Sequence, residues 1–262
     1  MRTFLVTGAG RGIGLEVARL CAARGDVSRV IALDKAFPED WDDKVCDGGR
    51  RDEDGDCAVE ALKYDLCKRT AGDFRDLVGV VGPVDTLVNN AGTLFCPDPD
   101  GLATGGQEDG EGGGLGFTAG MVEDILETNL KAPVGLIEAL APQMCARGSG
   151  RIVNVGSVSA FTGHPDLWYG ATKAGLLNIT KTFASLLGKH GITVNAVAPG
   201  PTLTEMYESL PQSRKDMVER TVNSGRPAQP REVAEAILWL GLDAPLYVNG
   251  STLDVNDSSY PR

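Results

Sequence analysis

The feature that most constrains the fold is a glycine-rich run, Gly8-Ala-Gly-Arg-Gly12-Ile-Gly14, close to the start of the chain. It directly follows the apolar stretch 3–7 and precedes a helix that we expect at residues 13–24. Small residues at such a junction let the backbone approach a pyrophosphate at a helix N-terminus, where the partial positive charge favours an anion. The spacing differs from G-x-G-x-x-G, and a turn needed only for tight packing is the alternative. We predict a strand–turn–helix unit that binds a dinucleotide.

Short apolar runs alternate with amphipathic stretches along the chain, which is typical of a parallel sheet covered by helices. We expect strands at residues 3–7, 30–33, 62–65, 84–88, 151–155, 193–198 and 247–255. We expect helices at residues 13–24, 68–81, 121–146, 168–190 and 230–242, and an irregular, partly helical flap at 201–226. The pattern predicts a single α/β domain.

Bulk composition excludes several classes of protein. The 262 residues, 42% hydrophobic and 23% charged, are enough for one large α/β domain. No apolar run reaches the roughly 18–20 residues of a membrane helix, and the first strand begins almost at Met1, so we expect no membrane span, no leader and a cytoplasmic location. The net charge of −11 argues against nucleic acid and anionic membranes as partners. The six scattered cysteines predict reduced thiols and no metal site.

Most of the negative charge lies in two segments. Residues 36–60 carry ten acids and three bases, and residues 97–113 carry five acids and no base. Both segments lack hydrophobic periodicity and are rich in turn-forming residues. We interpret residues 36–60 and 97–114 as solvated surface insertions.

Asp34 ends the second predicted strand, 20 residues after Gly14. A carboxylate at this place can accept hydrogen bonds from adenosine ribose hydroxyls, and it repels a 2′-phosphate. This favours NAD over NADP. The alternatives stay open that Arg11 and Lys35 bind a 2′-phosphate instead, or that Asp34 is a simple turn residue.

Tyr169 and Lys173 are four residues apart on a predicted helix, so their side chains share one face. An ammonium beside a phenol favours the phenolate, which makes the tyrosine a usable acid/base group. Ser157 lies just beyond the predicted strand 151–155. It can bind a substrate oxygen, or it can be a strand-end hydroxyl bonded to the backbone, with Ser159 as a less favoured substitute.

Seven motifs in order resemble those of the short-chain dehydrogenase/reductase family. They are the turn at residues 7–14, Asp65-Leu66, Asn89-Asn90-Ala91-Gly92, Asn129 in Glu-Thr-Asn-Leu, Ser157, Tyr169-x-x-x-Lys173 and Pro199-Gly200-Pro-Thr-Leu-Thr204. The resemblance implies a Rossmann-type, doubly wound sheet of seven parallel strands in the order 3-2-1-4-5-6-7, with its site at the carboxyl ends of the strands. It also implies a nicotinamide cofactor, a small-molecule alcohol or ketone substrate, and a homodimer or homotetramer.

The resemblance assigns roles to single residues. Ser157 would orient the substrate, Tyr169 would be the general acid/base, and Lys173 would lower the Tyr169 pKa and hold the nicotinamide ribose. Asn129 would anchor a proton-relay water, or else be only a structural amide that bends its helix. The other expected cofactor residues are Gly8, Arg11, Gly12, Ile13 and Gly14 at the pyrophosphate, Asp34 and Asn90 at the adenosine ribose, Asp65 and Leu66 at the adenine, and Thr202 and Thr204 at the nicotinamide carboxamide.

Three departures from the family pattern stand out. Ser157 and Tyr169 are 12 residues apart, where the family usually has 13, so the intervening loop is short. The segment after Asp34, which normally carries a helix, shows no clear helical face. The last strand leads into Asp254-Val-Asn-Asp257, where many relatives have a Gly-Gly pair.

Two histidines and two long helices complete the predictions. His164 either touches the substrate or is solvated in its loop, and His190 is expected at a helix C-terminus before Gly191. The helices at 121–146 and 168–190 carry more apolar residues than one buried face needs, which predicts a subunit interface. These residues are Leu126, Leu136, Leu140, Leu176, Ile179, Phe183 and Leu187.

The sequence thus predicts an NAD-dependent oxidoreductase that transfers hydride between nicotinamide and a secondary alcohol or ketone. A dehydratase or epimerase on the same fold, and a non-catalytic NAD-binding protein, are the alternatives. Apolar residues in the flap and near the catalytic loop favour an apolar cyclic or aromatic substrate. They are Met206, Tyr207, Leu210, Met217, Val218, Phe161 and Trp168.

Overall fold

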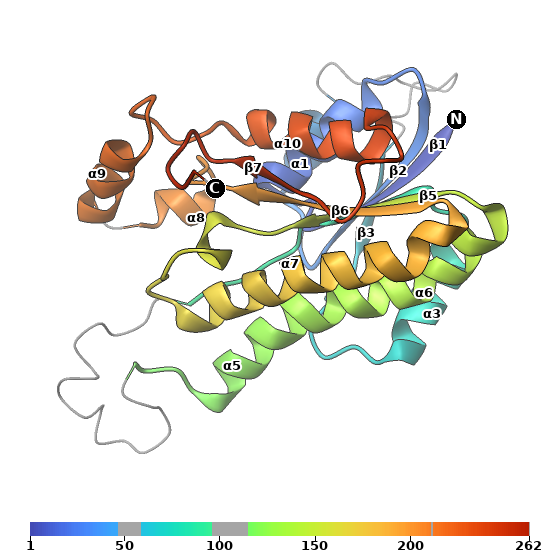
Figure 1. The fold of residues 1–262 in the computed structure, drawn as a ribbon, viewed down its shortest axis with the longest axis horizontal. Helices are drawn as coiled ribbons and strands as arrows, with labels where there is room; N and C mark the ends of the chain where they lie inside the picture. The colour runs from blue at the N-terminus through green and yellow to red at the C-terminus, as the bar shows by residue number, and fades with distance from the viewer. Residues whose placement is uncertain (47–58, 96–114, 211, 262) are drawn as a thin grey trace.

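Seven parallel strands form one sheet in the order β3-β2-β1-β4-β5-β6-β7 in a computed structural model, which describes residues 1–46, 59–95, 115–210 and 212–261 (Figure 1). The strands are β1 (Arg2–Thr7), β2 (Val27–Asp34), β3 (Val59–Lys63), β4 (Thr86–Asn89), β5 (Gly150–Val155), β6 (Ile192–Pro199) and β7 (Thr252–Val255). The predicted fold class and strand order are confirmed.

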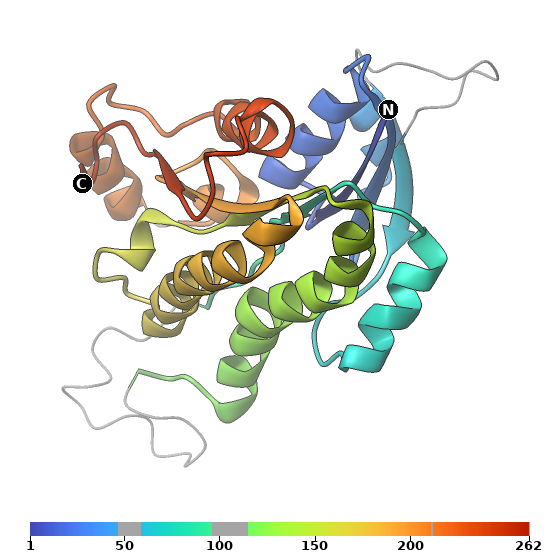
Figure 2. The same cartoon turned by 45° about the vertical axis from the view of Figure 1, so that its right-hand side comes forward.

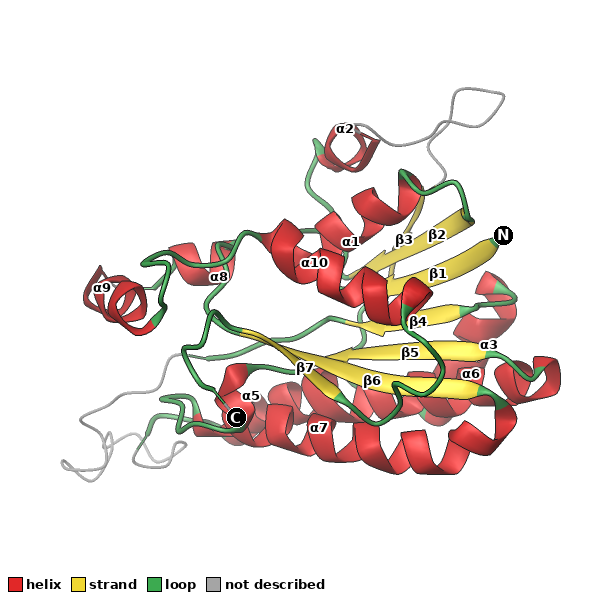
Figure 3. Ribbon diagram, turned by 45° about the horizontal axis from the view of Figure 1, so that its top comes forward, coloured by secondary structure: helices red, strands yellow, loops and turns green. Residues whose placement is uncertain are grey.

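Helices cover both faces of the sheet (Figures 2 and 3). One face carries α1 (Gly12–Ala22), α2 (Trp41–Cys46) and α10 (Pro230–Leu238), and the other carries α3 (Ala71–Val81), α5 (Ala119–Leu126), α6 (Ala132–Arg147) and α7 (Leu167–Leu187). Successive strand residues point to opposite faces. Phe4 and Val6 of β1 therefore join the core under α1 and α10, whereas Leu5 joins the core over α3 and α6. Burial on both faces explains why the central strands are continuous apolar runs.

Irregular helical turns interrupt or end three helices. A π-helix, Glu127–Lys131, joins α5 to α6, and a second one, Trp239–Asp243, follows α10. Helix α7 ends in a 3₁₀ turn, Gly188–His190, closed by Gly191 at φ +74°. His190 therefore lies at a helix C-terminus, as predicted. No helix in the described part of the chain combines the length and apolarity needed to cross a bilayer.

The interpretation of residues 36–60 as a solvated insertion is wrong for its first part. Helix α2 lies there, and its Trp41 and Val45 are only 2% and 1% exposed in the core against α1. Residues 47–58 of the first predicted insertion, and residues 97–114 of the second, lie outside the described residues. The last two residues of the first insertion, 59–60, belong to β3. The connection after Asp34 thus carries a helix after all.

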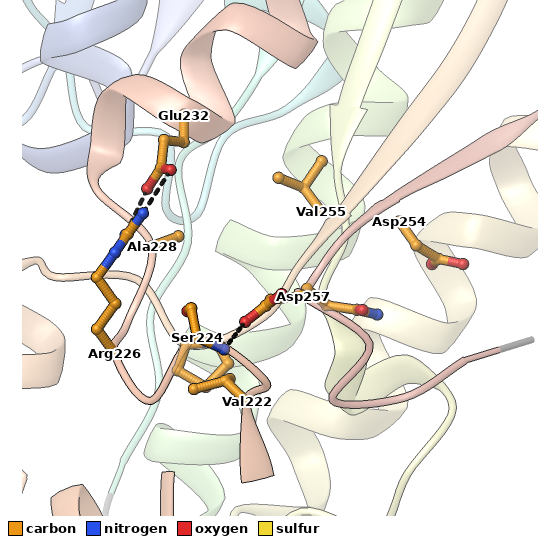
Figure 4. Close-up of a pocket in the computed structure, with 10 residues that line it drawn as sticks. Val222, Ser224, Arg226, Ala228, Glu232, Asp254, Val255 and Asp257 are labelled. Atoms are coloured by element: carbon orange, nitrogen blue, oxygen red, sulfur yellow. Dashed lines mark hydrogen bonds and ion pairs between the residues drawn. The ribbon is translucent and has the colours of Figure 1, made fainter. Parts of the chain in front are cut away.

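The predicted flap contains two short helices, α8 (Glu205–Glu208) and α9 (Gln212–Thr221). Its far end is tied to the turn after β7, because Asp257 Oδ2 accepts a hydrogen bond from Ser224 N at 2.5 Å (Figure 4). Strand β7 begins at Thr252 and not at the predicted residue 247. Tyr247 lies in a turn before the strand, and its side chain is fully exposed.

Candidate active site

The glycine turn lies between β1 and β4, where the strand order reverses. Thr7 Oγ1 accepts hydrogen bonds from the main-chain N–H groups of Asn90 and Ala91, both at 3.0 Å. The Asn90 side-chain amide donates to the carbonyls of Thr7 and Gly8, also at 3.0 Å. Asn90 thus braces the turn, and ligands of open α/β sheets bind at this switch point.

The turn has no room for larger residues. Gly8 has φ +65°, and a Cβ placed on Gly14 would lie 2.1 Å from the Gly8 carbonyl oxygen. Trp41 of α2 stabilises the turn, because its Nε1 donates a hydrogen bond to the Ala9 carbonyl at 2.9 Å. The sequence prediction missed this role of Trp41. The first turn of α1 contains no acidic residue, so its N-terminus suits the phosphates of a dinucleotide.

Asp34 stands where the sequence predicts it, at the end of β2 beside the turn. Its Oδ2 accepts a hydrogen bond from Gly10 N at 2.8 Å, and its Oδ1 accepts one from Ala36 N at 3.3 Å. Arg11 is held away toward the flap by an ion pair with Glu205, at 2.7 Å between Nη1 and Oε2. The carboxylate and not the guanidinium is therefore fixed beside Gly10.

The expected adenine contacts differ in exposure. Asp65 is exposed and accepts a hydrogen bond from Cys67 N at 3.0 Å. Leu66 is 6% exposed and packs in the core over α3 and α6, and its contact with adenine stays a prediction.

The start of the flap lies against the glycine turn. A Cβ on Gly12 would come within 3.1 Å of Thr204 Cγ2. Thr204 caps α8, and Thr202, 9% exposed, donates to the Gly200 carbonyl at 3.0 Å. The expected pyrophosphate and carboxamide residues therefore adjoin each other, which fits a nicotinamide dinucleotide.

Tyr169 and Lys173 lie in the first two turns of α7. Lys173 is 3% exposed, its Nζ donates to the Val155 carbonyl at 2.7 Å, and the same Nζ is 5.6 Å from the Tyr169 ring centroid. Ser157, two residues beyond the end of β5, lies near Tyr169, and its hydroxyl acts to lower the pKa of the phenol. Ser157 Oγ also accepts a bond from Ser159 N and donates to Ser159 Oγ, each at 3.1 Å. The structure thus brings together all three predicted residues, with Ser157 also bonding the backbone.

The pKa of Tyr169 is shifted mainly by its burial, and its lowering by Lys173 stays a prediction. Burial raises the pKa of Tyr169, and the hydrogen bond with Ser157 only partly offsets this. Burial also lowers the pKa of Lys173 to about 8, because a desolvated ammonium is disfavoured. The protein's own groups therefore favour a protonated phenol.

Asn129 lies in the π-helix between α5 and α6 and is 1% exposed. Its Oδ1 accepts a bond from Thr93 N, and its Nδ2 donates to Thr93 O, both at 2.8 Å, and to Thr172 Oγ1 at 3.2 Å. A Cβ on Gly92 would lie 3.4 Å from Lys173 Nζ and 3.5 Å from Asn129 Oδ1. The side chain braces the loop after β4 beside Lys173, and the water relay stays a prediction.

Two further residues contact Tyr169. The half-buried His164 ring lies 5.2 Å from the Tyr169 ring, between centroids, and its contact with substrate stays a prediction. Asp166 is the N-cap of α7, with Oδ1 accepting a bond from Tyr169 N at 2.9 Å. The signal for Asp166 was an aspartate just before an apolar-periodic helix.

A cavity of about 260 Å³ lies between the end of the flap and the end of β7 (Figure 4). The ion pair between Arg226 and Glu232, 2.8 Å, lies on its wall. None of the predicted catalytic residues lines it. Within the described residues, no cluster of three or more His, Cys, Asp or Glu side chains is arranged for a metal ion.

Comparisons with known proteins agree with this geometry. A family model described as short chain dehydrogenase matches residues 2–215. The chain is 32% identical to a 3-oxoacyl-(acyl-carrier-protein) reductase FabG of Staphylococcus epidermidis, over 99% of each chain. It is 34% identical to the same-named protein of Vibrio cholerae, over 98% of this chain and 96% of that one.

Two solved structures of dehydrogenases align with almost the whole chain. A provisionally assigned 2-deoxy-D-gluconate 3-dehydrogenase from Agrobacterium tumefaciens, with bound NADP, aligns at a TM-score of 0.82 and 28% identity, over 100% of this chain and 97% of that one. A provisionally assigned gluconate 5-dehydrogenase from Beutenbergia cavernae, also with bound NADP, aligns at 0.80 and 29%, over 98% and 96%.

Proposed function

Because the chain belongs to the short-chain dehydrogenase family, we propose that it transfers hydride between a nicotinamide cofactor and a secondary alcohol or ketone, with Tyr169 as general acid/base. The observation that carries the proposal is that Tyr169 and Lys173 lie together at the start of α7. Lys173 reaches the end of β5 and the loop after β4, and that loop braces the glycine turn.

The chemistry follows from what each side chain can do with a proton. Ser157 binds the substrate oxygen, and Tyr169 donates its proton to a ketone oxygen or accepts the proton of an alcohol. When bound, the nicotinamide supplies or accepts the hydride. For oxidation near pH 7, the Tyr169 pKa must fall about three units below its ordinary 10, which requires about 4 kcal/mol of preferential phenolate stabilisation.

Lys173 contributes to that stabilisation when it is protonated. Because burial alone raises the Tyr169 pKa and lowers the Lys173 pKa, the positive charge of the oxidised cofactor is needed as well. Reduction uses the protonated phenol, which is the form that the protein's own groups favour.

The test of this role is the Tyr169→Phe variant, assayed for a net change in NADH or NADPH absorbance with a panel of alcohols and ketones. Turnover by the wild type and its loss in Tyr169→Phe support the proposal. Turnover of substrate without net cofactor oxidation or reduction would instead point to a dehydratase or epimerase. Cofactor binding without any turnover would point to a non-catalytic binding protein.

We propose NAD as the preferred cofactor, although both solved relatives above carry NADP. The support is that Asp34 is fixed beside Gly10, while Arg11 is held by Glu205. The carboxylate would repel a 2′-phosphate. Titration of the protein with NADH and NADPH tests this, and Asp34→Ala should narrow the difference between them. Tighter binding of NADPH by the wild type would show that Arg11 with Lys35 dominates.

We propose an apolar cyclic or aromatic alcohol as substrate. Met206 of α8 is 41% exposed, and Phe161, near the catalytic loop, stacks on Tyr260 with 6.0 Å between ring centroids. Tyr207 is 8% exposed and packs inward, and the side chain of Met217 is outside the described residues. Activity on small sugars or sugar acids, with none on alicyclic alcohols, would refute this choice.

We also propose a homodimer or homotetramer in the cytoplasm. Leu136, Leu140 and Leu176 are fully buried in the chain's own core, so the expected interface is narrower than the sequence predicted. Leu126, Ile179, Phe183 and Leu187 remain half-buried, and Leu186 is 57% exposed. The molar mass in light scattering, for the wild type and for Leu186→Asp, tests this surface.

A further inference from the structure

Asp166 is a buried carboxylate, 1% exposed, three residues before Tyr169. Its Oδ1 accepts a hydrogen bond from Tyr169 N at 2.9 Å, and its Oδ2 accepts one from Phe95 N at 2.8 Å. No ion pair involves this carboxylate among the described residues. A buried charge without a cation is costly, so its two N–H donors are what hold it there.

Capping alone does not explain this residue. A serine or threonine hydroxyl also caps a helix, as Thr70 does for α3, and brings no charge. The second oxygen of Asp166 is used instead on Phe95, 71 residues away in the sequence. Phe95 follows Thr93, which Asn129 holds from the π-helix. One carboxylate therefore joins the loop after β4 to the start of α7.

We propose that Asp166 is a positioning residue of the active site, which fixes Tyr169 against the loop after β4 and holds a buried carboxylate beside the start of α7. This inference rests on the proposed acid/base role of Tyr169. It concerns a residue outside the set of Ser157, Tyr169 and Lys173.

Three charged or titratable groups among the described residues lie close to Tyr169. They are Asp166, the Lys173 ammonium at 5.6 Å from the ring centroid, and the His164 ring at 5.2 Å. Burial is the main cause of the raised pKa of Tyr169, and the charge of Asp166 adds to it. A protonated Lys173 acts the other way, because an ammonium favours the phenolate. The Asp166 main-chain N–H also donates to His164 Nδ1 at 3.2 Å, so the loop that carries the ring is fixed as well.

The test measures the ionisation of Tyr169 directly, without a substrate. The chain has five tyrosines, so ¹³Cζ-tyrosine NMR gives five titrating signals, and the one lost in Tyr169→Phe is that of Tyr169. In Asp166→Asn and Asp166→Ser we expect its midpoint to fall by about one pH unit, a tenfold change in the ionisation constant. Thr70→Ala, which removes a cap from α3, should leave the midpoint unchanged.

A second readout tests the link to the loop. Asp166→Ser keeps a cap for Tyr169 N but has no second oxygen for Phe95, so hydrogen exchange at the Phe95 amide should become at least tenfold faster than in the wild type. An unchanged Tyr169 midpoint in a folded variant, or unchanged Phe95 exchange in Asp166→Ser, would overturn the inference. If Asp166→Asn does not fold, Asp166→Ser decides alone.

The two proposals can fail separately. Full turnover by Tyr169→Phe would refute the acid/base role of Tyr169, and the NMR titration would still report on Asp166. An unchanged titration together with an inactive Tyr169→Phe would refute only the role of Asp166.

Discussion

Alanine substitutions at Gly14 and Gly79 should have opposite effects, although both glycines are in helices. At Gly14, the new Cβ would lie 2.1 Å from the Gly8 carbonyl oxygen and 2.6 Å from Asn90 Nδ2. Neither group can swing away, because the oxygen is main chain and the Asn90 amide donates to two carbonyls of the turn. The turn must open by more than about 1 Å to reach an ordinary contact distance.

Overpacking of this kind costs about 1–3 kcal/mol, and we expect the upper end because backbone must move. At roughly 2–4 °C per kcal/mol for a domain of this size, Gly14→Ala should lower Tm by about 6–12 °C. Gly79 in α3 is exposed, and its added Cβ would meet nothing within 4 Å. Gly79→Ala should therefore stabilise the protein by about 0.5–1 kcal/mol.

Thermal unfolding followed by circular dichroism measures both shifts, and fluorescence titration with NADH measures the second consequence. Gly14→Ala should lose most of its affinity for the cofactor, whereas Gly79→Ala should keep it. If Gly14→Ala unfolded within about 2 °C of the wild type and bound NADH normally, the close contact of Gly14 with the Gly8 carbonyl would not be needed for stability or for cofactor binding.

Three further predictions concern other side chains. Trp41→Phe removes the bond to the Ala9 carbonyl and should cost about 1–3 kcal/mol in urea unfolding, with weaker NADH binding; an unchanged midpoint would refute this. Burial lowers the pKa of Lys173 from 10.5 to about 8, because the buried ammonium is poorly solvated. The resulting loss of folding stability is complete below pH 8 and disappears as the pH rises to 10.5. Lys173→Met should accordingly be inactive yet more stable than the wild type at pH 7, with the gap closing toward pH 10. Arg226 lowers the pKa of Glu232 from 4.5 to about 2, so Glu232→Gln should be less stable than the wild type above pH 4.5, and the difference should vanish as the pH falls to 2.

The sheet was predictable because its central strands are short apolar runs between turn residues. Helix α2 was not predictable, since it has six residues, of which only Trp41 and Val45 are fully buried, and these are too few to show a helical period. The last strand was predicted too long because the main chain bonds to β6 only from residue 250 on, where Gly250 N donates to the Val194 carbonyl at 2.9 Å. Before it, Asn249 Oδ1 accepts a bond from Val194 N at 2.8 Å, which replaces a strand partner with a side chain.

In the candidate site, too, the local patterns were predictable and the tertiary contacts were not. The spacing of Tyr169 and Lys173 on one helix, and the glycine turn after a strand, are local patterns that a sequence displays. The capping position of Asp166 could have been predicted from the helix that follows it. Its hydrogen bond to Phe95 could not, because that bond depends on the tertiary structure. The net effect of burial on the Tyr169 pKa was missed for the same reason, since desolvation is a property of the packed site.

The position of β1 in the sheet has a consequence for folding. Its partner β2 is close in sequence, but its other neighbour, β4, is synthesised some eighty residues later, with Phe4 pairing in register with Thr86. Until then β1 is a bare apolar edge, and such edges are prone to join the strands of other chains. Closing this large loop also slows folding. The strand pair beside the glycine turn thus leaves an apolar edge uncovered in the nascent chain, and chaperone dependence during expression should follow substitutions at this pair.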